Sequence, residues 1–174
     1  PIFYVSSSPW NLYDLLSDFF ALQDIPDGPL FLREWNGSAQ EGLPTEHRRH
    51  KLGVISRLLT RYPALPFILL GDSGQTDPEI YTEVVLSYPG RIRAVYIRDV
   101  SRAAERTAAI AELARTIAAA GSTLLLAADT LTLAQHLTAQ GLIAAEALAA
   151  VAADKAQDEA PPGDTERLLD VGDD

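Results

Sequence analysis

Short runs of apolar residues recur along the chain, each of a length typical of a buried β-strand. They occupy Ile2–Val5, Leu30–Leu32, Phe67–Leu70, Ile92–Ile97 and Thr123–Ala127. Between them lie apolar stripes with helical spacing, at Leu12, Leu15, Leu16 and Phe19, at Leu52, Ile55, Leu59 and Tyr62, and at Ile110, Leu113, Ala114 and Ile117. Near-continuous apolar strands that alternate with amphipathic helices are typical of a parallel sheet covered on both faces. The pattern predicts an α/β fold with a doubly wound, Rossmann-type parallel sheet.

Polar residues and glycines stand where the expected helices begin and end. Ser8, Asp77 and Ser101 are each placed to cap a helix that follows a strand. Gly121 is placed to end the helix before the fifth strand. Asp129 follows the fifth strand, where it either caps the next helix or lines the rim of a site.

The composition changes near the C-terminus. Residues 158–174 contain seven acidic residues against Arg167, a net charge of −6 within a total of −10. A segment of this kind cannot bury enough apolar surface to fold. We therefore expect one folded domain over residues 1–153 and an acidic, disordered tail over residues 154–174.

Composition also limits the function. The net charge of −10 argues against general nucleic-acid binding, which depends on Lys and Arg neutralising phosphates. With no Cys and three His, the chain excludes disulfides and Cys-ligated zinc, so any metal should be bound by oxygen ligands. No apolar stretch is long enough to span a membrane and no signal peptide is recognisable, so we expect a cytoplasmic protein, with or without peripheral contact with membranes.

Polar residues follow the first and third strands, at the sheet edge where such folds bind ligands. Ser6 and Ser7 lead toward a helix N-terminus, where hydroxyls and main-chain amides can bind a phosphate. The alternative is that they are turn residues beside a capping Ser8. Asp72 directly follows a buried strand, where a carboxylate needs a partner or a metal. With Asp77 it offers the oxygen ligands that Mg²⁺ prefers, although helix capping also explains Asp77.

A basic segment, His-Arg-Arg-His-Lys, occupies residues 47–51 at the start of an expected helix. Positive charges there oppose the helix dipole, so a bound anion would explain them; the alternative is a solvated basic turn. Lys51 is the candidate ligand for that anion. We expect His136, Arg98 and Asp99 to have structural roles.

Three segments in this order carry a family resemblance. Residues 3–13 read Phe-Tyr-Val-Ser-Ser-Ser-Pro-Trp-Asn-Leu-Tyr, residues 50–51 read His-Lys, and residues 71–79 read Gly-Asp-Ser-Gly-Gln-Thr-Asp-Pro-Glu. They resemble motifs two, three and four of the haloacid dehalogenase (HAD) superfamily of phosphohydrolases. More narrowly, about residues 1–143 resemble the catalytic domain of phosphatidate phosphatases of the actin-patch-protein type.

The resemblance implies a HAD-like fold and an Mg²⁺-dependent phosphatase acting in lipid metabolism. It implies that Ser6 or Ser7 binds a phosphoryl oxygen and that Lys51 neutralises the phosphate and the nucleophile. Asp72 would hold Mg²⁺, and Asp77 would be a weaker ligand or support Asp72. Lys51, Asp72 and Asp77 would thus form the catalytic set.

One part of the family's pattern is missing. Its attacking aspartate and its acid lie in an Asp-x-Asp motif on the first strand, and no Asp-x-Asp occurs in these 174 residues. The chain has no Met, and residues 2–5 already read as a buried strand. We therefore expect a C-terminal portion of a catalytic domain, truncated at its N-terminus, that turns over nothing alone because a carboxylate nucleophile forms the aspartyl-phosphate.

Two other functions fit the pattern. One is a phosphatase of a soluble phosphomonoester, since substrate choice in the superfamily lies in cap insertions, and residues 36–45 form the only obvious insertion. The other is a non-catalytic binding domain on the same fold. A phospholipid substrate would need access to a membrane surface, for which Trp10, Trp35 and the basic segment near Arg48 are the candidates. Nothing in the sequence indicates an oligomeric state.

Overall fold

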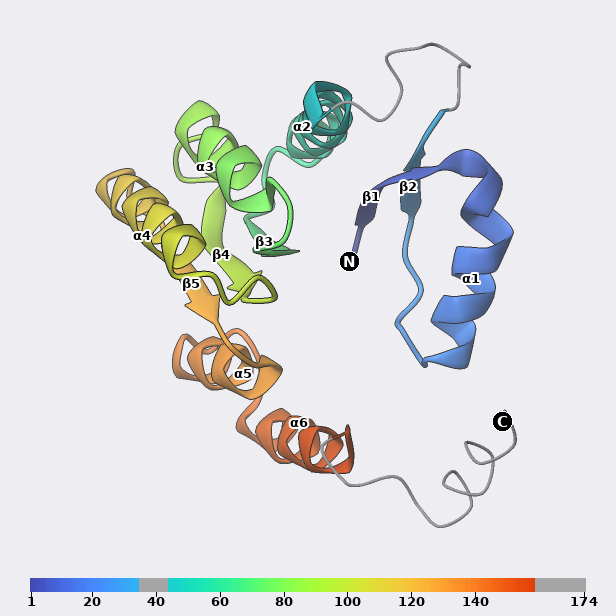
Figure 1. The fold of residues 1–174 in the computed structure, drawn as a ribbon, viewed down its shortest axis with the longest axis vertical. Helices are drawn as coiled ribbons and strands as arrows, with labels where there is room; N and C mark the ends of the chain where they lie inside the picture. The colour runs from blue at the N-terminus through green and yellow to red at the C-terminus, as the bar shows by residue number, and fades with distance from the viewer. Residues whose placement is uncertain (35–43, 159–174) are drawn as a thin grey trace, which may run out of the picture.

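The computed structural model describes residues 1–34 and 44–158, and these form an α/β fold (Figure 1). The strands are β1 (Tyr4–Pro9), β2 (Leu30–Arg33), β3 (Phe67–Asp72), β4 (Ile92–Arg98) and β5 (Leu124–Ala127). The helices are the short 3₁₀ helix η1 (Trp10–Leu12) and α1 (Tyr13–Leu22), α2 (Pro44–Arg61), α3 (Asp77–Ser87), α4 (Ala104–Ala119), α5 (Thr130–Ala139) and α6 (Ala145–Asp158). All observed strand pairs are parallel, which confirms the predicted fold class.

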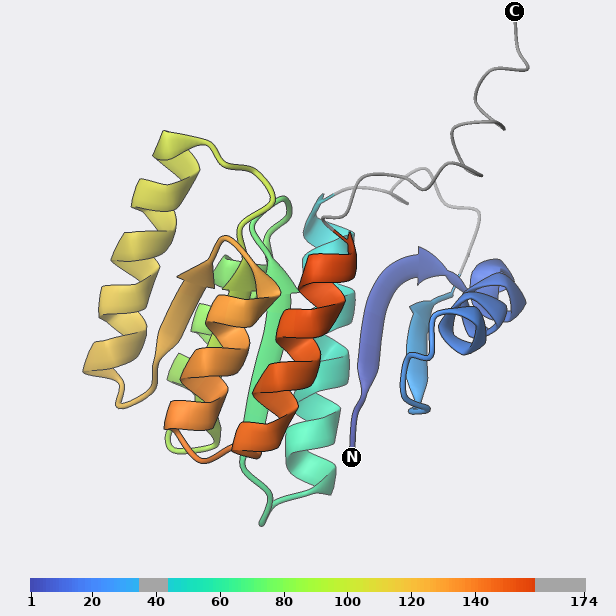
Figure 2. The ribbon, with the colours of Figure 1, turned by 90° about the horizontal axis from the view of Figure 1, so that it is seen from below.

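The strands form two separate parallel sheets. β1 pairs with β2, and β3, β4 and β5 form a three-stranded sheet in that order. Figure 2 shows β1 and β2 beside the larger sheet, with β1 curving away at its C-terminal end. At the other end of β1, the Phe3 ring lies 5.5 Å from the ring of Tyr62 and 6.4 Å from that of Phe67. The two parts therefore meet near the N-terminal ends of β1 and β3.

Helices cover both faces of the three-stranded sheet (Figures 1 and 2). Because side chains alternate along a strand, Val95 and Ile97 of β4 face one core cluster with residues from α2, α3 and α4. Ala94 and Tyr96 face the opposite cluster, which includes Leu133 of α5. This two-sided burial explains why β4 reads as a continuous apolar run.

Two of the expected helix caps are confirmed. Asp129 accepts a hydrogen bond from the main-chain N–H of Thr132 at 2.8 Å and so caps α5. Gly121, with a φ of 81°, follows the last turn of α4, where glycine tolerates the left-handed conformation.

The other three caps are wrong, and in each case the side chain has another partner. Ser8 lies within β1 and its hydroxyl accepts a hydrogen bond from Ser6. Asp77 is the first residue of α3, and its carboxylate pairs with Lys51. The Ser101 hydroxyl donates to Asp99 at 3.4 Å. No side chain caps η1, α3 or α4 in the described structure.

Some sequence-based predictions fall outside the described residues. These include Trp35, residues 36–43 of the expected insertion and residues 159–174 of the acidic tail. α6 continues to Asp158, across the expected boundary between residues 153 and 154, and the domain division stays a prediction. Over residues 1–34 and 44–158, no helix combines the length and apolar character needed to cross a membrane.

Candidate active site

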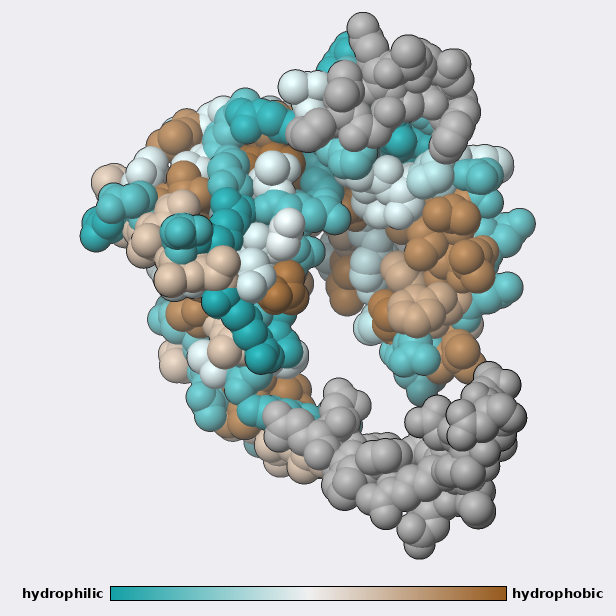
Figure 3. Space-filling model, viewed as in Figure 1, coloured by the Kyte–Doolittle hydropathy of each residue, from teal (hydrophilic) through white to brown (hydrophobic). Residues whose placement is uncertain are grey.

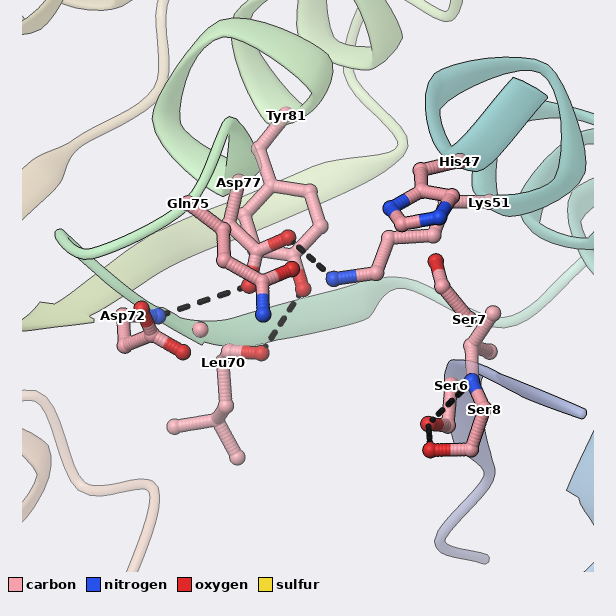
Figure 4. A pocket seen from close by; sticks show the side chains of 12 residues that line it. Ser6, Ser7, Ser8, His47, Lys51, Leu70, Asp72, Gln75, Asp77 and Tyr81 are labelled. Carbon is pink, nitrogen blue, oxygen red and sulfur yellow. Dashed lines mark hydrogen bonds and ion pairs between the residues drawn. The ribbon is translucent and has the colours of Figure 1, made fainter. Parts of the chain in front are cut away.

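A cavity of about 500 Å³ opens between β1, the first half of α2, the end of β3 and the start of α3 (Figure 4). Its lining residues are Val5, Ser6, Ser7, Ser8, His47, Lys51, Leu70, Gly71, Asp72, Gln75, Asp77 and Tyr81. Every residue predicted from sequence to bind phosphate, bind metal or take part in catalysis is among them. The fold thus brings together residues from three separate segments.

Lys51 and Asp77 form a buried ion pair at the centre of this cavity. Lys51 is 9% exposed and Asp77 is 4% exposed. The Lys51 Nζ donates to Oδ1 of Asp77 (Figure 4). Removing two charges from water is costly unless they are paired, and here each charge compensates the other. Asp77 therefore holds the Lys51 ammonium group in the cavity.

The other carboxylate oxygen of Asp77 faces the end of β3. It accepts a hydrogen bond from the main-chain N–H of Asp72 at 3.4 Å. This approach requires a glycine at position 71, because an added Cβ there would lie 2.7 Å from Asp77 Oδ2 and 2.8 Å from Tyr81 Cε2. Gly71 thus allows α3 to pack closely against β3.

Tyr81 supports the same junction. It lies one helical turn after Asp77, and its hydroxyl donates to the carbonyl oxygen of Leu70 at 2.8 Å. Burial strongly raises the pKa of Tyr81, and the charges of Asp77 and Asp72 raise this pKa further. The hydroxyl therefore remains a hydrogen-bond donor throughout the physiological pH range.

Asp72 is the carboxylate best placed to bind a metal. Its Oδ1 accepts a hydrogen bond from the Gly74 N–H at 2.8 Å, while both oxygens of Asp77 already have donors. Mg²⁺ is often bound through one or two carboxylates together with water and a substrate phosphate, so Asp72 fits as one ligand. Within residues 1–34 and 44–158 there is no cluster of three or more His, Asp or Glu side chains that could hold a metal ion.

The serines of β1 do not lie in a turn before a helix, as the sequence suggested, but within the strand itself. Ser6 and Ser8 bond to each other: the Ser6 Oγ donates to the Ser8 Oγ at 3.0 Å and accepts from the Ser8 N–H at 3.1 Å. The Ser7 Oγ is buried and has no hydrogen-bond partner among the described residues. In Figure 4 it points toward His47 and Lys51. Ser7 is therefore the serine with an unused hydroxyl facing the basic side of the cavity.

The arginines of the basic segment pair with acids on the protein surface. Arg48 pairs with Glu83 on α3, and Arg49 lies 3.8 Å from Glu46. Both arginines are exposed, as the solvated alternative expects, but they lie within α2 rather than in a turn. Only His47 and Lys51 of residues 47–51 line the cavity.

The residues expected to be structural have protein partners. The His136 Nδ1 lies 2.9 Å from the hydroxyl of the buried Tyr96. Arg98 donates to Thr130 at 2.8 Å, and Asp99 accepts from Ser73 at 2.9 Å.

Sequence reasoning did not single out Gln75 and Tyr81 as site residues. The signal for Tyr81 was its spacing of four residues from Asp77, which places both on one face of a helix. Gln75 carried no comparable signal, because its position depends on the course of the loop.

Comparison with known proteins identifies the family. Residues 1–99 match the family described as "Phosphatidate phosphatase APP1, catalytic domain". The chain is 38% identical to Phosphatidate phosphatase APP1 of Saccharomyces cerevisiae over 96 residues, which are 55% of this chain and 16% of that protein. It is 36% identical to an uncharacterised protein of Schizosaccharomyces pombe over 103 residues, or 57% of this chain and 16% of that protein.

The chain therefore spans about one sixth of the length of these relatives, since each alignment covers 16% of the relative. No solved structure gives a significant match. The matched residues 1–99 run from β1 through β4 and include every residue that lines the cavity. The chain belongs to the phosphatidate phosphatase APP1 catalytic-domain family.

Proposed function

We propose that this chain forms the phosphate-binding and metal-binding part of an Mg²⁺-dependent phosphatidate phosphatase. The reaction hydrolyses a phosphomonoester through an aspartyl-phosphate, with the nucleophilic aspartate supplied from outside these residues. One observation carries the proposal. A hydroxyl from β1, an ammonium group from α2 and a carboxylate from β3 line one cavity, within the segment that matches the family's catalytic domain.

The residues around the cavity suit a phosphoryl group. An ammonium group has three donors, and Lys51 uses one for Asp77, so others can reach phosphoryl oxygens. The unused Ser7 hydroxyl adds a donor on the same side. Phosphoryl transfer depends mainly on positioning and on compensation of negative charge, and a charge held in advance by Asp77 needs little reorganisation.

Asp72 supplies the carboxylate for Mg²⁺, and the bound ion would compensate charge on the transferring phosphoryl group. Water and the substrate phosphate would complete the coordination, together with residues outside those described. Each oxygen of Asp77 accepts one hydrogen bond from the protein, so Asp77 supports Lys51 and is a weaker candidate ligand for Mg²⁺ than Asp72.

A phosphatidate substrate lies in a bilayer, so the enzyme must reach a membrane surface. Figure 3 shows apolar surface over α1, in brown. An exposed patch is formed by large hydrophobic side chains of η1 and α1. Its members are Trp10 (65% exposed), Tyr13, Leu15, Phe19 and Leu22. Trp10 follows the cavity residue Ser8 by two positions along the chain. Trp and Tyr are typical of membrane interfaces.

The test is phosphate release from phosphatidate vesicles by the full-length protein, with Mg²⁺ or with a chelator. We expect release that requires Mg²⁺, and none from residues 1–174 alone. A panel of soluble phosphomonoesters serves as the comparison. Faster turnover of sugar phosphates than of phosphatidate would assign the site to soluble substrates, and absence of Mg²⁺-dependent release from every phosphomonoester would contradict the proposal.

A further inference from the structure

The loop between β3 and α3, residues 73–76, directly follows the cavity residue Asp72 and carries a second one, but it buries little of itself. Asp72 and Gln75 line the cavity, whereas Gly74, Gln75 and Thr76 are exposed and only Ser73 is buried, at 2% exposure. Contacts from elsewhere in the fold must therefore keep this loop in place.

Arg106, in the first turn of α4, supplies several of these contacts. Its Nε donates to the carbonyl oxygen of Ser73 at 2.9 Å, and its Nη2 donates to that of Gln75 at 2.6 Å. The same guanidinium binds both carboxylate oxygens of Glu79 in the first turn of α3, with an Nη2 to Oε2 distance of 3.0 Å. A planar guanidinium can hold this many partners in one geometry, which an ammonium group cannot.

The side chain of Ser73 attaches the loop to the connection between β4 and α4. Its hydroxyl donates to Asp99 Oδ1 at 2.9 Å and accepts from the main-chain N–H groups of Val100 and Ser101, at 2.9 and 3.0 Å. The N–H of Ser73 also bonds to the carbonyl oxygen of Arg98 at 2.9 Å. The loop is thus held to the β4–α4 connection at one residue and to α4 through Arg106.

The charges are consistent with this arrangement. The hydrogen bond from Arg106 is the main cause that lowers the pKa of Glu79, and Glu79 in turn raises the pKa of Arg106. The negative charge of Asp72 also raises the pKa of Arg106, so the guanidinium interacts electrostatically with the cavity carboxylate. Arg106 itself does not line the cavity.

We infer that Arg106 is a positioning residue of the active site. By holding the carbonyl groups of Ser73 and Gln75, and by fixing α3 through Glu79, it sets where Asp72 and Gln75 stand in the cavity. The expected consequence for Mg²⁺ rests on the proposed function, because it takes Asp72 as a metal ligand. The ordering of the loop by Arg106 does not depend on that role.

The test compares Arg106→Lys with the wild type in the full-length protein. Lysine keeps the charge but cannot hold two carbonyls and a carboxylate together. We expect faster hydrogen exchange at Gly74, whose N–H bonds to Asp72, and an Mg²⁺ affinity by titration calorimetry that is lower by about 10- to 100-fold, as for other groups that orient a ligand. The kcat should fall more than the KM for phosphatidate changes.

Arg115→Lys is the matched control. Arg115 lies on the same helix and pairs with Glu112, but both side chains are exposed and neither lines the cavity. This variant should leave loop exchange, Mg²⁺ affinity and activity at wild-type values. Thermal unfolding of both variants separates a local effect on the loop from a general loss of stability.

Further variants distinguish the carbonyl contacts from the ion pair. Exchanging the two charges, with Arg106→Glu and Glu79→Arg together, restores an ion pair but removes from α4 the guanidinium that donates to Ser73 and Gln75, and we expect no recovery. Full recovery of loop exchange and Mg²⁺ affinity would overturn the inference, as would wild-type exchange in Arg106→Lys. If Arg106→Lys does not fold, Glu79→Gln is measured instead. In this variant Arg106 keeps its contacts with the carbonyl groups of Ser73 and Gln75, so hydrogen exchange at Gly74 should stay slow, and fast exchange would contradict the inference.

The exchange measurement needs neither Mg²⁺ nor turnover. The absence of phosphatase activity in the full-length protein would contradict the proposed function without testing the role of Arg106. In that case slow exchange in the wild type and fast exchange in Arg106→Lys would still support the positioning role.

Discussion

The part of the molecule built on β3, β4 and β5 packs against helices on both faces, whereas the part built on β1, β2 and α1 has a thin core. Ile97 of β4 is fully buried, and α3 alone buries seven residues. Before Glu34, Leu32 is the only buried hydrophobic residue, and α1 buries none of its residues. Leu15 of α1 remains 64% exposed.

The cavity spans both parts, and its chemistry is divided between them. Lys51, Asp72 and Asp77 stand on elements that belong to the well-packed part, so their geometry is firmly held. The serines stand on β1, which contacts α2 but does not pair with β3. The charged side of the site is therefore preorganised, whereas the position of the hydroxyl groups depends on how β1 is held against α2.

The largest expected effect comes from removing Lys51. In Lys51→Met, the buried Asp77 carboxylate loses its partner, which typically costs about 3 to 5 kcal/mol of unfolding free energy. Activity of the full-length protein should fall by about 100- to 1000-fold, as for loss of a preorganised charge at a transferring group. Chemical denaturation and phosphate release measure the two effects.

The control for this effect is the double variant Lys51→Met with Asp77→Asn. Removing the second charge should recover part of the lost stability but none of the activity. If the single variant is as stable as the wild type, the ion pair is not as buried as the structure indicates.

The second prediction tests the difference in packing directly. Ile97→Ala should cost about 2 to 5 kcal/mol, because it leaves a cavity in the core. Leu15→Ala on α1 should change stability by no more than about 0.5 kcal/mol, since the side chain already contacts solvent. Both are measured by denaturant unfolding. Equal losses would mean that α1 is covered by another part of the full-length protein.

The two parts also differ in how well the sequence predicted them. Each of the five apolar runs overlaps a strand, although β1 begins at Tyr4 rather than Ile2. For β4, which is buried on both faces, a near-continuous apolar sequence is what the strand requires. The extension of β1 to Pro9 was missed, since three serines in a row carry no strand signal. Pairing of Pro9 with Arg33 of β2 determines that extension, and such a contact cannot be deduced from local sequence.

Within the site, the residue types were predictable and their partners were not. Asp77 before Pro78 has the local pattern of a helix cap, but it pairs with Lys51, which lies 26 residues earlier. Tertiary electrostatics therefore overrides a local preference. Likewise, the sequence does not distinguish Ser6 from Ser7. Both lie in β1, where successive side chains point to opposite faces, so only the structure shows which hydroxyl faces Lys51. The roles of these residues in binding Mg²⁺ and phosphate stay predictions.

The third prediction concerns these two serines. Ser7→Ala removes a hydroxyl that has no protein partner, so stability should change little. Affinity for inorganic phosphate should fall by about 10- to 100-fold if Ser7 donates to a charged oxygen. Ser6→Ala removes both bonds to Ser8 and should cost about 1 kcal/mol of stability with a smaller effect on phosphate. The opposite ranking in calorimetry would assign the phosphate contact to Ser6.

The smallest effect is expected where the two parts meet. Partial burial lowers the pKa of His50 on α2 below 6.5, and the positive charges of Arg57 and Arg33 lower it further. The main-chain groups of Phe31 and Ser6 act in the opposite direction but are outweighed. Since the unfolded chain binds this proton more readily, the contribution of His50 to stability is complete above pH 6.5 and is lost as the pH falls toward the pKa of the folded state.

His50→Gln isolates this contribution from that of the other titrating groups. The variant keeps a polar side chain of similar size but has no charge to gain, so its stability should decline less than that of the wild type as the pH falls below 6.5. Denaturant unfolding over a series of pH values measures the difference. A parallel decline in both proteins would show that protonation of His50 does not weaken the contact between α2 and the β1–β2 part. The loss of stability in acid would then belong to carboxylates of the well-packed part.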